Sequence, residues 1–260
     1  MKTRSELTED QFKDLYVFLS IIGARFKDFT IVQGCFRSRT DDLTCLVETR
    51  FECFDGMDFG LSGIKAFVRM LSTLDKTSSV EVTQDDEFVF FSDGQVIVDL
   101  KKIQGSFNEN PFISEDEMRR ILDQVVNEES PIIKETIHRS VVSNIGKMCR
   151  DFQTNVVTIR QQKGDPGRGY LVVEEHPGSG PSGSSRRYTV ALKTGFITPI
   201  KEGTKMIMSN FPYLFNKSDV TLEVKRCTDA GIVAIIHKAT VGYLSVSIFG
   251  RSALMEENDE

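Results

Sequence analysis

The chain repeats one order of secondary-structure patterns, and this repetition restricts its fold more than any other sequence feature. In each half an amphipathic helix precedes several strands, and a second short helix then precedes three more strands. The helices are expected at residues 8–24, 62–74, 140–152 and after Ser209. The strand triplets are expected at residues 79–83, 87–91 and 95–100, and at 220–226, 232–238 and 244–249. Identity between the halves is low, so the duplication is one of architecture.

Other strands are predicted between the helices of each half. The first half has apolar runs at residues 29–32 and 43–47, with the polar segment 37–42 as the turn between them. The second half has strand patterns at 155–161, 170–175 and 188–193. With more strand than helix, the pattern predicts an α+β fold of two similar domains, each with antiparallel sheets that carry helices on one face.

Charge marks the boundaries between these domains. Residues 106–130 carry seven acidic and two basic side chains, and the last six residues carry four acidic ones. We predict a first domain at 1–102, an acidic connector at 103–135, a second domain at 136–252 and an acidic tail at 253–260. Without the two acidic segments the net charge of −6 becomes about +3. An acidic total therefore leaves room for a local basic, nucleic-acid-binding face.

Nothing in the chain predicts an export signal or a membrane helix. The first residues are charged where a signal peptide needs an apolar stretch, and no apolar run approaches the roughly 18 residues of a membrane span. Five cysteines without a C-x-x-C pair favour free thiols in a reducing compartment. We expect a cytoplasmic protein.

Signals for an enzyme are scarce. His138, His176 and His237 lie far apart and lack metal-ligand spacing, and we interpret them as structural or surface groups. Asp55 and Asp58 form a carboxylate pair that a hydrolase could use, although their spacing also fits a turn. We therefore expect a protein that is not an enzyme and that holds no cofactor or metal.

A glycine- and serine-rich segment at 178–185 lacks the Gly-Lys-Ser/Thr ending of a phosphate-binding loop. We interpret it as a flexible loop between two strands. Arg186 and Arg187 at its base could contact phosphate or keep the loop soluble.

The predicted helices carry basic residues on their polar faces. Lys65 and Arg69 lie one turn apart in the second helix, Lys147 and Arg150 lie opposite the apolar side of the third, and Lys13 lies in the first beside Asp10 and Asp14. Each could be an ordinary surface charge, but together they suggest phosphate contacts that are independent of base sequence.

Apolar residues gather near the connector and the last strand. Most such residues anchor a linker, but an exposed apolar groove beside a linker would dock a partner peptide. The members considered are Phe107, Pro111, Phe112 and Ile113 in the connector, and Ile248 and Phe249 at the end of the last strand.

The chain resembles DNA sliding clamps, the processivity factors of DNA polymerases, and most of all the clamps of T-even-type tailed phages. The resemblance lies in Arg50–Phe54, in Leu61-Ser62-Gly63-Ile64-Lys65 to Leu71, and in the strands from Ser79 to Leu100. Ser209–Phe215 followed by residues 220–224 resembles the same element in the second domain. The longer acidic connector and the glycine/serine loop depart from the pattern.

The resemblance implies a homotrimeric ring loaded onto double-stranded DNA by an ATP-driven clamp loader. It implies that Lys65, Arg69, Lys147 and Arg150, together with Lys13 and Arg139, face the DNA. It also implies a groove for DNA polymerase and loader peptides near Phe112, Ile113, Leu214, Phe215, Ile248 and Phe249. The alternative is a β-rich structural or virion-associated protein without a DNA role.

Overall fold

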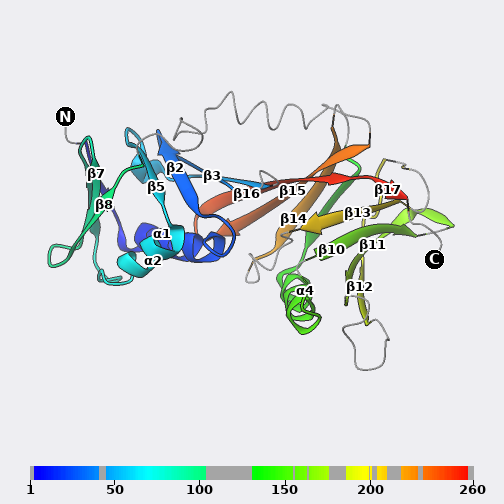
Figure 1. Ribbon diagram of the computed structural model, residues 1–260. Coiled ribbons are helices and arrows are strands. Elements are labelled where there is room, and N and C mark those ends of the chain that lie inside the picture. The colour runs from blue at the N-terminus through cyan, green and yellow to red at the C-terminus, as the bar shows by residue number, and fades with distance from the viewer. Residues whose placement is uncertain are drawn as a thin grey trace. The chain divides into compact units, whose positions relative to one another are not determined.

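The computed structural model divides the chain into two compact units (Figure 1). The first unit comprises Met1–Met118 and Thr240–Ile248, and the second comprises Arg119–Ala239 and Phe249–Glu260. The structure describes residues 3–40, 45–103, 131–154, 156–162, 164–175, 186–198, 200, 204–209, 218–227 and 231–256.

Helix α1 (Glu9–Ile22) begins at a capping box. The Thr8 hydroxyl accepts the Gln11 N–H, and the Gln11 side chain accepts the Thr8 N–H at 2.9 Å. The helix buries one apolar face, made of Phe12, Leu15, Phe18, Leu19 and Ile22. The predicted helix at 8–24 is confirmed, with Phe18 replacing the partly exposed Tyr16 in the core.

The first sheet of the first unit has the order β1-β6-β7-β8, and all of its neighbours are antiparallel. The strands are β1 (Thr3–Leu7), β6 (Val80–Gln84), β7 (Phe88–Ser92) and β8 (Ile97–Lys101). The turn between β7 and β8 is set by Asp93, whose carboxylate accepts the N–H groups of Gln95 and Val96. The three strands predicted here are confirmed, and β1 is an additional strand.

A second sheet in the same unit has the order β5-β2-β3-β4-β16. Its strands are β2 (Asp28–Val32), β3 (Cys35–Arg39), β4 (Cys45–Arg50), β5 (Asp58–Ser62) and the Leu244–Ile248 part of β16 (Leu244–Ala253). The prediction that residues 37–42 form a turn is wrong for 37–39, which belong to β3. The turn from β2 to β3 lies at Gln33 and Gly34, which both have positive φ angles, 47° and 76°.

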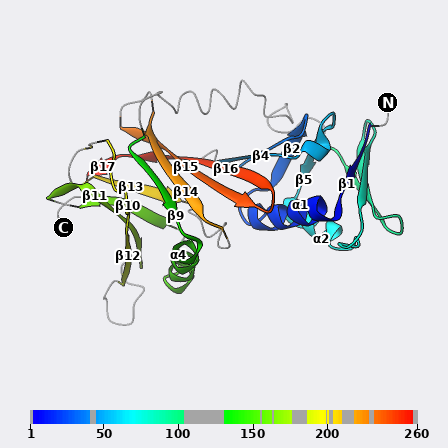
Figure 2. The same cartoon turned by 180° about the vertical axis from the view of Figure 1, so that it is seen from behind.

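Phenylalanines join the helices to this sheet. Phe29 of β2 stacks on Phe36 of β3 with ring centroids 4.9 Å apart, and on Phe67 at 5.7 Å. Phe67 belongs to α2 (Ile64–Leu71), which also buries Ile64 and Leu71. Helices α1 and α2 pack against each other (Figures 1 and 2). The first core therefore lies between the two helices and the sheet.

The second unit begins with β9 (Ile133–Ile137) and α4 (Arg139–Asp151). The predicted connector extends to residue 135, but strand β9 already starts at Ile133. Ile132 and Ile133 are fully buried and pair with β14. Helix α4 buries Val142, Ile145 and Cys149, close to the predicted face.

Two sheets complete the second unit. One has the order β12-β11-β10-β13-β17, and the other runs β9-β14-β15-β16. The strands are β10 (Val156–Gln162), β11 (Asp165–Glu174), β12 (Arg187–Ala191), β13 (Thr204–Ser209), β14 (Val220–Arg226), β15 (Ile232–Val241) and β17 (Met255–Glu256). Strand β16 ends at Ala253 and β17 follows, so strand structure continues into the predicted tail.

The sheet orders establish the internal duplication. In the first repeat, β1-β6-β7-β8 and β5-β2-β3-β4 form around α1 and α2. In the second, β9-β14-β15-β16 and β13-β10-β11-β12 have the same connectivity around α4. The predicted α+β fold of two similar halves is confirmed. The predicted helix after Ser209 lies outside the described residues.

Candidate nucleic-acid interface

Helix α2 presents two basic side chains to solvent. It begins after Gly63, whose φ of +79° is the left-handed conformation that favours glycine. Ile64, Phe67 and Leu71 fill the core, so Lys65 and Arg69 project from the opposite face, one turn apart, and both are exposed. No described acidic residue forms an ion pair with either of them. Both cations are therefore available to a phosphate backbone.

Lys13 in α1 has a different environment. It is exposed, but it forms an ion pair with Glu9 one turn earlier in the helix. The hydrogen bond that the Lys13 ammonium donates to the Glu9 carboxylate raises the pKa of Lys13 above its usual value. Since α1 packs on α2, Lys13 belongs to the same helical layer as Lys65 and Arg69, but its charge is already partly compensated.

Helix α4 supplies the basic face of the second unit. Its N-terminus is fixed by His138, whose ring accepts the Ser140 N–H, and by Asp219, which accepts the Arg139 N–H at 2.7 Å. Its opposite side contacts β11 and β12. Arg139, Lys147 and Arg150 are all exposed. At about 100° per residue, these three side chains project within one sector of the helix.

Few residues of the predicted peptide groove can be placed. Phe112, Ile113, Leu214 and Phe215 lie outside the described residues. Ile248 is buried in the first unit, with 2% of its surface exposed, so it offers no open surface. Phe249 packs in the second unit against a small cluster of Cys227, Ala234 and Ile236.

The polar residues considered as catalytic or phosphate-binding groups have structural partners. Asp58 accepts the Gln33 N–H at 2.9 Å, and Asp55 pairs with Arg50 at 2.9 Å, so both carboxylates support the turn between β2 and β3 and its surroundings. His237 is buried in β15, and burial lowers its pKa to about 4. His176 lies outside the described residues.

Arg186 and Arg187 are occupied by carboxylates across the hairpin. Arg186 forms a bidentate salt bridge with Glu175, and Arg187 forms a salt bridge with Glu174. The Arg186 guanidinium holds the pKa of Glu175 below its usual value. Strands β11 and β12 are antiparallel neighbours, so the segment that includes 178–185 connects a hairpin, as predicted. Its residues lie outside the described part.

The described residues contain neither a cluster suited to a metal ion nor a helix that could span a membrane. In the parts of the chain listed above, no group of three or more His, Cys, Asp or Glu residues is placed to hold a metal ion. None of the helices described is both long enough and apolar enough to cross a bilayer. The five cysteines are free thiols.

The described architecture matches solved structures along its whole length. Proliferating Cellular Nuclear Antigen from Entamoeba histolytica aligns with a TM-score of 0.62 and 12% identity, over 97% of this chain and 98% of that one. The chain has the fold of PCNA-type sliding clamps. The PCNA of A. fulgidus, solved with the C-terminal region of FEN-1 bound, gives 0.57 and 11% over 100% of both chains. A PCNA2–PCNA3 complex from Sulfolobus tokodaii gives 0.59 and 13%, over 98% of this chain and 100% of that one.

The sequence matches no family model and no curated protein. The clamp fold is therefore visible in structure where sequence comparison finds nothing. The clamp-like architecture that the family resemblance implies is confirmed at the level of the fold.

Two features of this architecture were missed in the sequence. Strands β8 and β12 each end a sheet and have only one neighbour among the described strands. Their sequences show no sign of this, because an edge strand and a central strand can share one alternating pattern. In the structure, the β8 edge is marked by Ile97, which has 67% of its surface accessible.

Proposed function

We propose that this chain is a non-enzymatic sliding clamp that encircles double-stranded DNA and tethers the replicative DNA polymerase to it. The observation that carries the proposal is the duplicated clamp architecture, which aligns end to end with PCNA structures. A sliding clamp works by encircling DNA, so its function depends on its fold and assembly. It needs no catalytic group.

The proposed ring follows from the duplication. Within the chain, β4 lies beside β16. Strand β4 is the third of the series β2-β3-β4, and β16 is the third of the series β14-β15-β16. The equivalent strands that remain are β12, the third of β10-β11-β12, and β8, the third of β6-β7-β8. If β12 of one copy pairs with β8 of the next, the contact is head-to-tail, and it gives a closed ring when the rotation between copies completes a full turn. We propose a homotrimer, as the clamp resemblance implies, with six repeats around the opening.

The exposed cations of α2 and α4 support a DNA-lined opening. Phosphate contacts by Lys65, Arg69, Lys147 and Arg150 would be independent of sequence, which allows sliding. Arg139 would join them, and Lys13 would contribute less because Glu9 already pairs with it. A chain of net charge −6 can bind DNA in this way when its acidic groups lie away from these faces.

We also propose that polymerase and clamp loader dock through short peptides. The PCNA of A. fulgidus holds the C-terminal region of FEN-1, and an equivalent peptide here would bind near the apolar cluster of Phe249. The remaining predicted groove residues, Phe112, Ile113, Leu214 and Phe215, would complete the site. An ATP-driven loader, a cytoplasmic location and a phage origin belong to the same proposal.

The mass of the purified protein tests the ring. Light scattering should give about three times the chain mass of 29.3 kDa. A monomer at every concentration up to the micromolar range would contradict the homotrimer. It would favour the alternative of a β-rich structural protein whose basic helices are incidental.

A further inference from the structure

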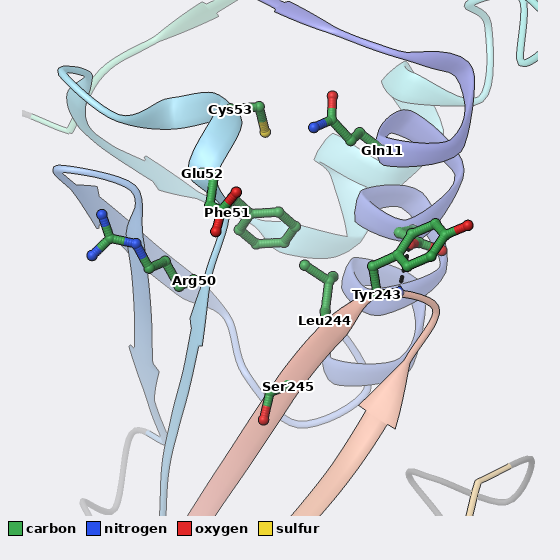
Figure 3. A pocket seen from close by; sticks show the side chains of 9 residues that line it. Gln11, Arg50, Phe51, Glu52, Cys53, Tyr243, Leu244 and Ser245 are labelled. Atoms are coloured by element: carbon green, nitrogen blue, oxygen red, sulfur yellow. Dashed lines mark hydrogen bonds between the residues drawn. The ribbon is translucent and has the colours of Figure 1, made fainter.

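A hollow of about 360 Å³ opens on the first unit. Three segments form it: the N-terminal half of α1, the corner from β4 to the short 3-10 helix η1 (Glu52–Phe54), and the turn from β15 to β16. Figure 3 shows side chains from these segments facing one another across it. Its volume is within the range of ligand pockets, at the small end.

The hollow has an apolar floor and an aromatic rim. Phe51 and Leu244 form the floor and are almost fully buried, at 3% and 8% exposure. Tyr243 on the rim is 84% exposed, the largest exposure among the large apolar residues described. A two-residue hairpin turn has no structural need for an aromatic side chain, so the ring is available for a contact outside the chain.

The position of Tyr243 is fixed by α1. The Asp14 carboxylate accepts the Tyr243 N–H at 2.9 Å. Gly242 makes room for this carboxylate, because a Cβ there would lie 1.8 Å from Asp14 Oδ1, and its φ of +59° also favours glycine. The turn and the helix therefore fit each other, and the backbone of Tyr243 is held at the rim of the hollow.

The charge around the hollow is negative. Asp14 and Glu52 both line it, and no described cation forms an ion pair with either. The single basic lining residue, Arg50, is paired with Asp55 at 2.9 Å. Cys53 adds no charge near neutral pH, because burial raises the pKa of its thiol to about 11.

We propose that this hollow receives an arginine side chain presented by a protein partner. The methylene stem would lie on Phe51 and Leu244, and the guanidinium would reach Glu52 and the face of Tyr243. A hollow open to solvent suits a side chain carried on a peptide, and its charge excludes an acidic segment. This site lies outside the groove proposed for polymerase peptides and does not depend on ring closure.

The test uses the full chain labelled with ¹⁵N and the peptide acetyl-Gly-Arg-Gly-amide. Saturable amide shifts are expected at Glu52, Cys53 and residues 243–245. The matched peptide with citrulline, which has the shape of arginine without its charge, should leave them unmoved. Tyr243→Ser and Glu52→Gln should each weaken binding about tenfold. Tyr243→Phe keeps the ring and should bind as the unmodified chain does.

Glu6→Gln is the control, because Glu6 is exposed on β1 and does not line the hollow. Equal binding of the arginine and citrulline peptides would overturn the proposal. So would unchanged affinity in both Tyr243→Ser and Glu52→Gln. Because both side chains are exposed, these variants should fold normally, and unchanged amide spectra elsewhere would confirm it.

Discussion

The hydroxyl of Thr49 donates to the carbonyl of Ser245 at 2.9 Å, across 196 positions of sequence. The contact joins β4 to β16, so the hairpin near the end of the chain completes a sheet of the first unit. The duplication places β12 and β8 in the roles of β4 and β16. A chain that forms this junction once within itself carries the strands to form it again with a second copy.

The first prediction concerns that junction between copies. Ile97 on β8 is 67% exposed, so Ile97→Lys should leave the folded chain intact. At a subunit boundary it would place an unpaired charge in a buried contact, which is strongly unfavourable. We expect light scattering to show a shift from trimer towards monomer.

Ile207→Lys is the matched control for that experiment. Ile207 is also an exposed isoleucine, at 39%, but it lies on β13 between β10 and β17, away from a free sheet edge. The Ile207→Lys variant should therefore remain a trimer. Equal dissociation in both variants would mean that added charge, and not the β8 edge, weakens the assembly.

The second prediction concerns the basic helices. Replacement of Lys65, Arg69, Lys147 and Arg150 together by alanine should abolish most stimulation of the polymerase, because it removes phosphate contacts without touching the core. The fold should remain, since all four side chains are exposed. Primer extension on a long template measures the effect.

A control of equal charge removes four basic residues on strands: Arg4, Lys134, Arg168 and Lys205. These should leave stimulation near its original level. Full stimulation by the helix variant would instead support the structural protein without a DNA role.

The third prediction is a pH dependence of stability. Burial lowers the pKa of His237 from 6.5 to about 4. The folded chain therefore keeps the imidazole neutral, whereas the unfolded chain protonates it below about pH 6.5. The contribution of the neutral His237 to the free energy of unfolding is fully present above pH 6.5. It is lost as the pH falls towards 4, by at most about 3 kcal/mol. His237→Gln should lose less stability between pH 7 and pH 5, as measured by urea denaturation. Parallel losses in both proteins would contradict the assignment.

The fourth prediction concerns the phenylalanine core. Phe36 is fully buried and its ring stacks on Phe29 and meets Phe18 edge to face. Phe36→Ala should lower the free energy of unfolding by about 3–5 kcal/mol. Phe88→Ala, on a partly exposed ring, should cost clearly less. Similar losses would show that the first core does not depend on this cluster.

Much of the fold could be predicted because its helices and most strands follow local rules. The capping pair of Thr8 and Gln11 starts α1 where the amphipathic pattern begins, and the apolar run of β14 matches its observed bounds. Strand β3 was missed because Arg37 and Arg39 make it look like a turn. In the structure Arg37 pairs with Glu48 on β4, and Ser38 is buried and donates to the Asp28 carbonyl.

The candidate site was only partly predictable, for a physical reason. Helical spacing shows that Lys65 and Arg69 point away from a core, and the structure agrees. Spacing cannot show that Glu9 pairs with Lys13, that Ile248 is buried, or which strands end a sheet. Those properties arise from contacts between distant segments, such as Thr49 with Ser245.

Retention on closed DNA tests the central claim most directly. Protein incubated with a nicked plasmid circle, the clamp loader and ATP, and then passed through a gel-filtration column, should remain with the DNA at moderate salt. A restriction cut that linearises the same plasmid should release it, because a ring can slide off a free end. Equal retention on circular and linear DNA, or no retention on either, would contradict a sliding clamp.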